Sequence, residues 1–289
     1  MGDMRYEAPD TLDAAVALLA GAAGDALVLA GGTDVLVQLH CDMIEPDLLV
    51  DIKKIPDVRA ISEEDGAWRI GAAATGMELM ENDAFSAAWP GVIDAVKLIG
   101  SIQVKGRATV GGNLCNASPG ADSVPAIMVA GAIATIIGPD GTREVPAEDI
   151  AIAPGKTSLG KGEIIVSFTF PKRPPHSGGA YLRFIPRTEM DIAVVGVGID
   201  LTLDDGGTCT AARLAIGAVA ERALLVEEAA ATLIGTKVDD DALGKLAAAC
   251  SAACRPIDDK RGTKEYRIKV AGVLAQRVAK IALDRARAN

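Results

Sequence analysis

The hydrophobic pattern of the first 55 residues predicts strands that alternate with a helix. Apolar side chains recur at helical spacing over residues 12–19, directly after possible N-cap residues at 9–11. Residues 26–30 and 48–52 are short apolar runs, which are typical of buried strands. The first run leads straight into Gly31-Gly32. A strand, a glycine turn, a connection and a second strand within about thirty residues indicate a βαβ-type unit.

The middle of the chain has a stronger strand pattern. Residues 68–72 and 163–170 are predicted strands, and the second of these stops at a proline. Residues 91–104 are predicted to be helical. An apolar stretch over residues 124–137 then meets the sequence GPDGT at 138–142, a strong turn signal before another strand.

The last third begins after a segment rich in proline and glycine, residues 172–179, which is the best linker candidate. Three strands with a turn signal at residues 204–207 predict an antiparallel meander, over residues 179–184, 193–203 and 210–218. Helical periodicity then predicts three helices, over residues 221–233, 241–254 and 263–286.

These elements predict an α+β protein in three parts. A small N-terminal α/β piece covers residues 1–55, and a mixed second piece covers residues 56–174. An antiparallel three-stranded sheet with helices follows over residues 178–289. A chain of 289 residues is long enough to bury a core in such parts.

Composition narrows the classes of function. The net charge is −10, from 29 basic and 39 acidic residues, which argues against a nucleic-acid partner. No run of eighteen apolar residues occurs, so no membrane span is predicted. The N-terminus shows no signal peptide, and the five cysteines are scattered like free thiols of a reducing compartment. We therefore expect a cytoplasmic protein.

Metal binding and nucleophilic hydrolysis have little support in the sequence. Cys250 and Cys254 are four residues apart on a predicted helix, but a metal would need two further ligands. Small core residues are the ordinary interpretation of that pair. The only histidines are His40 and His176, and no G-x-S-x-G elbow is present.

Two double glycines are the candidate chemistry. A strand that runs into adjacent glycines leaves backbone N–H groups exposed to an anion, typically a phosphate. Gly31-Gly32 has this arrangement before Thr33 and Asp34, and Gly111-Gly112 repeats it between Thr109 and Asn113. Each pair alone is more often a simple turn, but two pairs could hold the two phosphates of a pyrophosphate. The sequence contains no P-loop, and the lone G-x-G at Gly196 and Gly198 lies within a predicted strand, unlike a Rossmann site.

Around these loops the sequence resembles the FAD-binding subunit of the xanthine dehydrogenase family of molybdenum hydroxylases. The greatest likeness is to the medium subunits of the carbon monoxide dehydrogenase type. The resemblance covers nearly the whole chain and includes a specific T-V-G-G-N-x-x-x-x-S-P-x-x-D string. Its motifs are AGGTD at residues 30–34, PDLLVD at 46–51, QVKGRATVGGN at 103–113, ASPGAD at 117–122 and RGTKEYR at 261–267.

The resemblance implies a set of FAD-binding residues, with residues 1–55 and 56–174 forming a two-part FAD-binding domain. The first loop would hold the pyrophosphate, the second would also line the flavin, Asp122 would contact the ribose or diphosphate region, and two isoleucines would pack near the isoalloxazine. Arg183 stands where the family often has a lysine near the ring. The implied residues are Val28, Leu29, Ala30, Gly31, Gly32, Thr33, Asp34, Val35, Ile99, Thr109, Val110, Gly111, Gly112, Asn113, Asp122, Ile165 and Arg183.

Each of the isolated positions also has a plain structural interpretation. Ile99 and Ile165 fit ordinary core positions, Arg183 fits a surface charge on a strand, and Asp122 fits a helix N-cap.

The resemblance also implies a role in electron transfer. In the family, a large subunit holds the molybdenum cofactor and a small subunit holds iron–sulfur clusters. FAD in this subunit would pass their electrons to an external acceptor, with no catalytic residue supplied by this chain. No cysteine-rich insertion is visible, so we expect no cluster here. The alternatives are a stand-alone FAD-dependent oxidase of the same wider fold, and a non-enzymatic assembly or binding protein.

Overall fold

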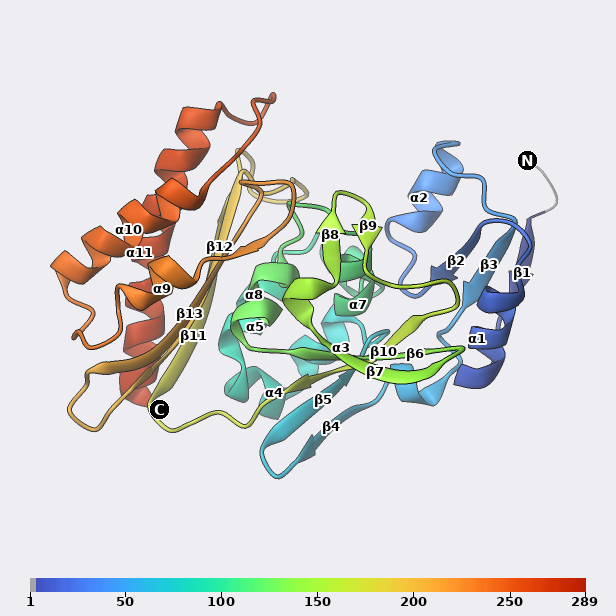
Figure 1. The fold of residues 1–289 in the computed structure, drawn as a ribbon, viewed down its shortest axis with the longest axis horizontal. Helices are drawn as coiled ribbons and strands as arrows, with labels where there is room; N and C mark the ends of the chain where they lie inside the picture. The colour runs from blue at the N-terminus through green and yellow to red at the C-terminus, as the bar shows by residue number, and fades with distance from the viewer. Residues whose placement is uncertain (1–3) are drawn as a thin grey trace.

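The computed structural model describes residues 4–289 and confirms the α+β class. Figure 1 shows three sheet-containing parts in chain order, from the blue N-terminal part to the orange and red C-terminal part. No helix among residues 4–289 is both long and apolar enough to cross a membrane.

The N-terminal part is a parallel three-stranded sheet in the order β1-β3-β2. The Thr11 hydroxyl caps the first helix by accepting from the Ala14 N–H, as its cap sequence predicts. β2 and β3 are parallel, which confirms the βαβ-type unit. The sequence did not indicate β1, a three-residue and largely exposed strand. The elements are β1 (Arg5–Glu7), α1 (Leu12–Gly21), β2 (Ala26–Leu29), α2 (Val35–His40) and β3 (Leu48–Asp51).

The second part is an antiparallel sheet in the order β4-β5-β10-β6-β7, accompanied by short helices. Its strands are β4 (Ile61–Glu64), β5 (Ala67–Gly71), β6 (Ile133–Gly138), β7 (Gly141–Pro146) and β10 (Ile164–Phe170), with a small ribbon of β8 (Ala151–Ala153) and β9 (Lys156–Thr157). The short helices are η1 (Pro56–Val58), α3 (Gly76–Glu81), α4 (Asp83–Ala88), α5 (Pro90–Val96), α6 (Ile102–Lys105), α7 (Val110–Cys115), α8 (Ser123–Val129) and η2 (Ala147–Asp149).

One prediction in this part is corrected, and one apolar stretch turns out to contain two elements. The helix expected over residues 91–104 is broken between α5 and α6, where Gly100 takes a positive φ of 54°. The apolar stretch 124–137 contains both α8 and β6, and Gly131 makes the turn with a φ of 66°. Apolar periodicity could not separate these elements, because a glycine can turn the chain inside a continuous apolar run.

The C-terminal part is an antiparallel sheet covered by the long helices. The meander is confirmed, but a fourth short strand adds to the expected three, in the order β11-β12-β13-β14. The helix expected over residues 221–233 is largely wrong, because residues 224–225 pair with β13 and only α9 is helical. The elements are β11 (Ser177–Phe184), β12 (Val195–Leu203), β13 (Cys209–Gly217), β14 (Leu224–Leu225), α9 (Glu227–Ala231), α10 (Asp240–Ala253) and α11 (Lys264–Ala288).

The predicted linker is shorter than expected, because its two glycines belong to β11. A Cβ at Gly178 would lie 2.0 Å from the Ala282 carbonyl oxygen, so glycine lets α11 pack directly on the strand.

Cys250 and Cys254 are buried among apolar side chains in the core of the C-terminal part. Their interpretation as small core residues is confirmed.

Ion pairs join the second and C-terminal parts at their interface. Arg285 of α11 donates to both carboxylate oxygens of Asp94 on α5, at 2.5 and 3.1 Å. Arg213 of β13 donates to Glu148 at 2.8 Å. These ion pairs hold the second and C-terminal parts together as one frame.

Asp200 on β12 gives the stability of this frame a pH dependence. Burial raises the pKa of Asp200 to about 7, against the pull of the Arg173 guanidinium at 2.7 Å. Burial likewise raises the pKa of Asp122 to about 6. Both carboxyls have an ordinary value of 3.8 when unfolded. At these two carboxyls the folded chain therefore holds more protons in between, and their contribution to the free energy of unfolding should fall as the pH rises from about 4 to about 7.

Urea denaturation at a series of pH values measures this slope. Asp200→Asn removes the carboxyl with the pKa of about 7, so the free energy of unfolding should fall less between about pH 6 and 7 than in the parent chain. Equal slopes for the parent and the variant would contradict the assignment.

Candidate functional site

A cleft of about 530 Å³ lies between the N-terminal part and the second part. Its walls come from the end of β2, the following turn and α2 on one side, and from α7 and the strands around β10 on the other (Figure 1). Most residues of the predicted FAD site line this cleft, namely Val28, Ala30, Gly31, Gly32, Thr33, Asp34, Val35, Ile99, Thr109, Gly111, Gly112, Asn113 and Ile165.

The first glycine turn has the form that the sequence predicts. β2 ends at the buried Leu29, and Gly32 adopts a positive φ of 79°, which an L side chain would strain. Within residues 4–289, the N–H groups of Gly31, Gly32, Thr33 and Asp34 have no hydrogen-bond acceptor. Four consecutive free donors beside a cleft are suited to an anion.

The second glycine pair differs from the prediction. Gly111 and Gly112 are not in a turn after a strand, but in the first turn of α7, which the Thr109 hydroxyl caps. Their N–H groups are already bonded, to the Ala72 carbonyl oxygen at 3.2 Å and to the Thr109 hydroxyl at 3.0 Å. The second glycine pair therefore offers no free N–H donor to a ligand. The free donors are the N–H groups of the first glycine turn.

The glycines differ in what surrounds the missing Cβ. At Gly31 a Cβ would lie 2.0 Å from the Arg107 carbonyl oxygen, and at Gly111 it would lie 2.5 Å from the Ala72 carbonyl oxygen. At Gly112 a Cβ would meet only the Thr109 hydroxyl, at 2.9 Å. Gly31 and Gly111 thus allow backbones to pack closely, and Gly112 keeps space open in the cleft.

Apolar side chains complete the lining. Ile165 on β10 is 3% exposed and Ile99 is half-buried, so both fill core positions and face the cleft as well. Burial raises the pKa of the Cys115 thiol, also in the lining, to about 12, so this cysteine remains protonated.

A group of lining residues was missed by the sequence analysis. It includes the segment around β9 and the start of β10, brought to the cleft by the fold of the second part. No local pattern marks these residues, which are Gly155, Thr157, Leu159, Glu163 and Ile164.

One hydrogen bond links the two walls. The Asn116 side-chain amide donates to a carboxylate oxygen of Asp34 at 3.2 Å. Desolvation raises the pKa of Asp34 from its ordinary value. A carboxylate therefore lies beside the free N–H groups, where it opposes a bound anion.

Asp122 and Arg183 lie elsewhere, in a buried cluster between the second and C-terminal parts. The Asp122 carboxylate accepts from the Tyr181 hydroxyl at 2.9 Å and from the Arg183 guanidinium at 2.5 Å. The Arg183 side chain is 5% exposed, so it is not a surface charge. Asp122 holds the N-cap position of α8, but its side chain makes no cap hydrogen bond. Contact between this cluster and a flavin stays a prediction.

The G-x-G of β12 belongs to this cluster. A Cβ at Gly196 would lie 2.2 Å from the Tyr181 hydroxyl oxygen, so glycine makes room for the tyrosine that binds Asp122. The motif thus has a packing role inside a strand. Of the remaining predicted site residues, Leu29 and Val110 are buried and do not line the cleft.

Comparison with known proteins agrees with this architecture. Residues 2–173 match the family described as the FAD binding domain in molybdopterin dehydrogenase, and residues 180–282 match the CO dehydrogenase flavoprotein C-terminal domain. The chain is 34% identical over 286 residues to the carbon monoxide dehydrogenase medium chain of Afipia carboxidovorans, covering 99% of both chains.

Two further comparisons point the same way. The chain is 34% identical over 275 residues to the xanthine dehydrogenase FAD-binding subunit of Escherichia coli O157:H7, covering 94% of both. Its structure matches a chain of reconstituted CO dehydrogenase from Oligotropha carboxidovorans with a TM-score of 0.94 at 34% identity, covering 98% of this chain and 99% of that one.

Proposed function

The chain belongs to the family of FAD-binding medium subunits of carbon monoxide and xanthine dehydrogenases, and from this premise we propose that it holds FAD in the cleft between its first two parts. One observation carries the assignment to the cleft. Four consecutive unbonded N–H groups, from Gly31 to Asp34, lie beside the open space at Gly112. A diphosphate would satisfy those donors.

The residues of the chain have separate tasks in this proposal. The first glycine turn would bind the diphosphate, and Gly112 would leave room for it. Ile99 and Ile165 would cover apolar surface of the cofactor and keep water away from it. Bound FAD would supply the redox chemistry, in which electrons from the iron–sulfur clusters of a partner subunit would reach an external acceptor.

The proposal includes a larger assembly. We expect a large subunit with the molybdenum cofactor and a small iron–sulfur subunit as partners, because the chain belongs to a family of medium subunits. We also expect the reducing cytoplasm as its location. The support for that is chemical, since its five cysteines are all free thiols.

The experiment is a titration of the purified, FAD-free chain with FAD. We expect saturation at one FAD per chain, with a flavin absorbance spectrum that remains after gel filtration. A chain that stays colourless after incubation with FAD would overturn the proposal. Oxidation of a small alcohol by the loaded chain alone would favour the stand-alone oxidase, although neither His40 nor His176 lines the cleft.

Asp34→Asn should strengthen FAD binding. The variant removes a negative charge from the diphosphate side of the cleft and keeps an oxygen that can accept from Asn116. We expect the Kd for FAD at pH 7.5 to fall by roughly two- to fivefold, which is worth below about 1 kcal/mol. Asp34→Ala is the control, because it loses the same charge and also the hydrogen bond. A Kd for Asp34→Asn equal to or above that of the parent would contradict the assigned position of the diphosphate.

A further inference from the structure

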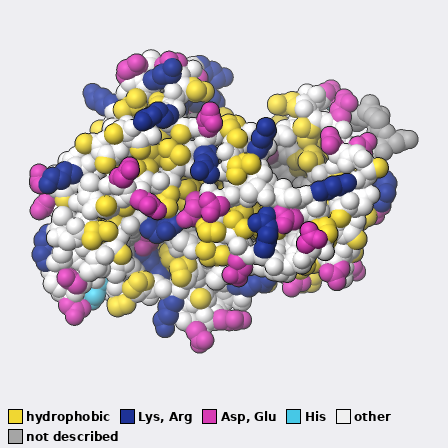
Figure 2. All heavy atoms as spheres, in the orientation of Figure 1, with side chains coloured by type: hydrophobic (Ala, Val, Ile, Leu, Met, Phe, Trp, Pro, Cys, Tyr) yellow, Lys and Arg dark blue, Asp and Glu magenta, His cyan; other side chains and the backbone are white. Residues whose placement is uncertain are grey.

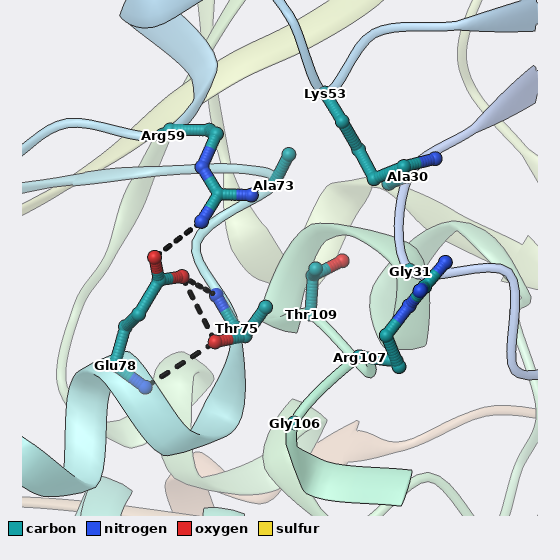
Figure 3. A pocket seen from close by; sticks show the side chains of 10 residues that line it. All are labelled: Ala30, Gly31, Lys53, Arg59, Ala73, Thr75, Glu78, Gly106, Arg107 and Thr109. Atoms are coloured by element: carbon teal, nitrogen blue, oxygen red, sulfur yellow. Dashed lines mark hydrogen bonds and ion pairs between the residues drawn. The ribbon is translucent and has the colours of Figure 1, made fainter.

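The first glycine turn also lines a second cavity, of about 330 Å³, through Ala30 and Gly31. It shares Ala30, Gly31 and Thr109 with the FAD cleft but has walls of its own. In Figure 3, Arg59 and Glu78 lie on one side of this pocket, and Lys53 and Arg107 lie on the other, beside Gly31. The proposed function uses Gly31 but none of the charged residues of this pocket.

Positive charge gathers in this cavity, although the chain as a whole carries a net charge of −10. Its described lining contains three cations, Lys53, Arg59 and Arg107, against one carboxylate, Glu78. On the face of the molecule drawn in Figure 2, acidic and basic side chains are interspersed. The excess of cations over carboxylates in this cavity therefore contrasts with the mixed charges on that face.

Two of the three cations already have partners and retain further donors. The Lys53 ammonium donates to Asp51 at 2.8 Å, and its other protons are free to bind elsewhere. Arg59 pairs with Glu78, whose second oxygen accepts from Thr75. These contacts hold both cations in place at the edge of the cavity.

Arg107 is different, because its guanidinium has no hydrogen-bond or ion-pair partner within residues 4–289. Its backbone is fixed, since the Arg107 carbonyl oxygen packs against the Cα of Gly31. Arg107 is an exposed residue in the lining of the cavity, so the N–H donors of its guanidinium are open to a ligand as well as to solvent. An arginine fork of this kind suits a doubly charged oxyanion better than a monovalent one.

We propose that this cavity binds a small phosphate-bearing anion, either inorganic phosphate or a phosphate monoester. Arg107 would make the main contact, and Lys53 and Arg59 would complete a ring of positive charge around it. The proposed function assigns the FAD diphosphate to the neighbouring cleft, which shares Ala30, Gly31 and Thr109 with this cavity but contains none of its three cations. The inference does not require FAD to be bound.

Isothermal titration calorimetry of the FAD-loaded full chain with inorganic phosphate tests the proposal, at ionic strength held constant with chloride. We expect saturable binding at one phosphate per chain, with FAD retained. Arg107→Gln should weaken that binding at least tenfold. Arg277→Gln is the matched control, because Arg277 is an exposed arginine of α11 outside the pocket lining, and it should bind phosphate like the parent. A parallel titration with methyl phosphate distinguishes the two sources, since tighter binding of methyl phosphate identifies a monoester.

Three outcomes would overturn the proposal. The first is no saturable binding of phosphate or methyl phosphate in the millimolar range. The second is an equal loss of binding in Arg107→Gln and Arg277→Gln. The third is stoichiometric displacement of FAD by phosphate, which would make the cavity part of the FAD site. A chain that binds phosphate but no FAD would instead refute the proposed function and leave this inference standing.

Discussion

Gly112→Val should abolish FAD binding while the chain still folds. A Cβ at this position would lie 2.9 Å from the Thr109 hydroxyl, which must shift, and no other atom lies within 4 Å of it on the cleft side. The added side chain would therefore take up space in the cleft lining. That space is where we place the diphosphate. We expect the Kd for FAD to rise at least about a hundredfold, equivalent to roughly 2.7 kcal/mol. FAD titration monitored by absorbance measures the change.

Gly244→Val is the matched control for this prediction. Gly244 is also a helical glycine, but it is exposed on α10 in the C-terminal part and has nothing within 4 Å of its Cβ position. Both variants replace a helical glycine by valine, and thermal melts should show that both fold. If Gly112→Val bound FAD as tightly as Gly244→Val, the position of the diphosphate would be wrong.

Arg183→Met should cost the largest amount of stability of any charge substitution considered for this protein. The side chains of Arg183 and Asp122 are 5% and 8% exposed, so removing the guanidinium leaves a buried carboxylate without its cation. Loss of one partner of a buried ion pair typically costs about 3–5 kcal/mol. Urea denaturation of the FAD-free chain gives the free energy of unfolding without a contribution from cofactor binding.

The double variant Asp122→Asn/Arg183→Met separates charge from packing. Neutralising the carboxylate should recover a large part of the lost stability, because no buried charge is left unpaired. Arg187→Met provides a surface control, since Arg187 is 68% exposed in its pair with Asp191 and should change stability little. A loss in Arg183→Met no greater than in Arg187→Met would contradict the buried pair.

Local signals in the sequence were sufficient for much of the fold. The cap at Thr11, the parallel pair β2 and β3, and the C-terminal meander all follow from patterns within short stretches of the chain. These patterns work because strand alternation and helix capping depend on neighbours in the chain. The predicted helix over residues 221–233 failed because residues 224–225 gained more by pairing with β13.

The candidate site was predicted in outline by the two glycine pairs. The sequence alone determined which segments carry the phosphate-binding potential, because a glycine pair after a strand is a local backbone property. It could not show that Gly111 and Gly112 have bonded N–H groups, so that the donors come from the first turn alone.

Only the tertiary structure decided where the isolated residues go. It placed Asp122 with Tyr181 and Arg183 in a buried cluster outside the cleft lining, and it brought Lys53, Arg59 and Arg107 around a second cavity. The sequence by itself determined the family motifs, the glycine turn, and the strands and helices whose patterns are local. The side-chain contacts between the parts depend on how the three parts pack, which no local pattern encodes, and only the structure could show them.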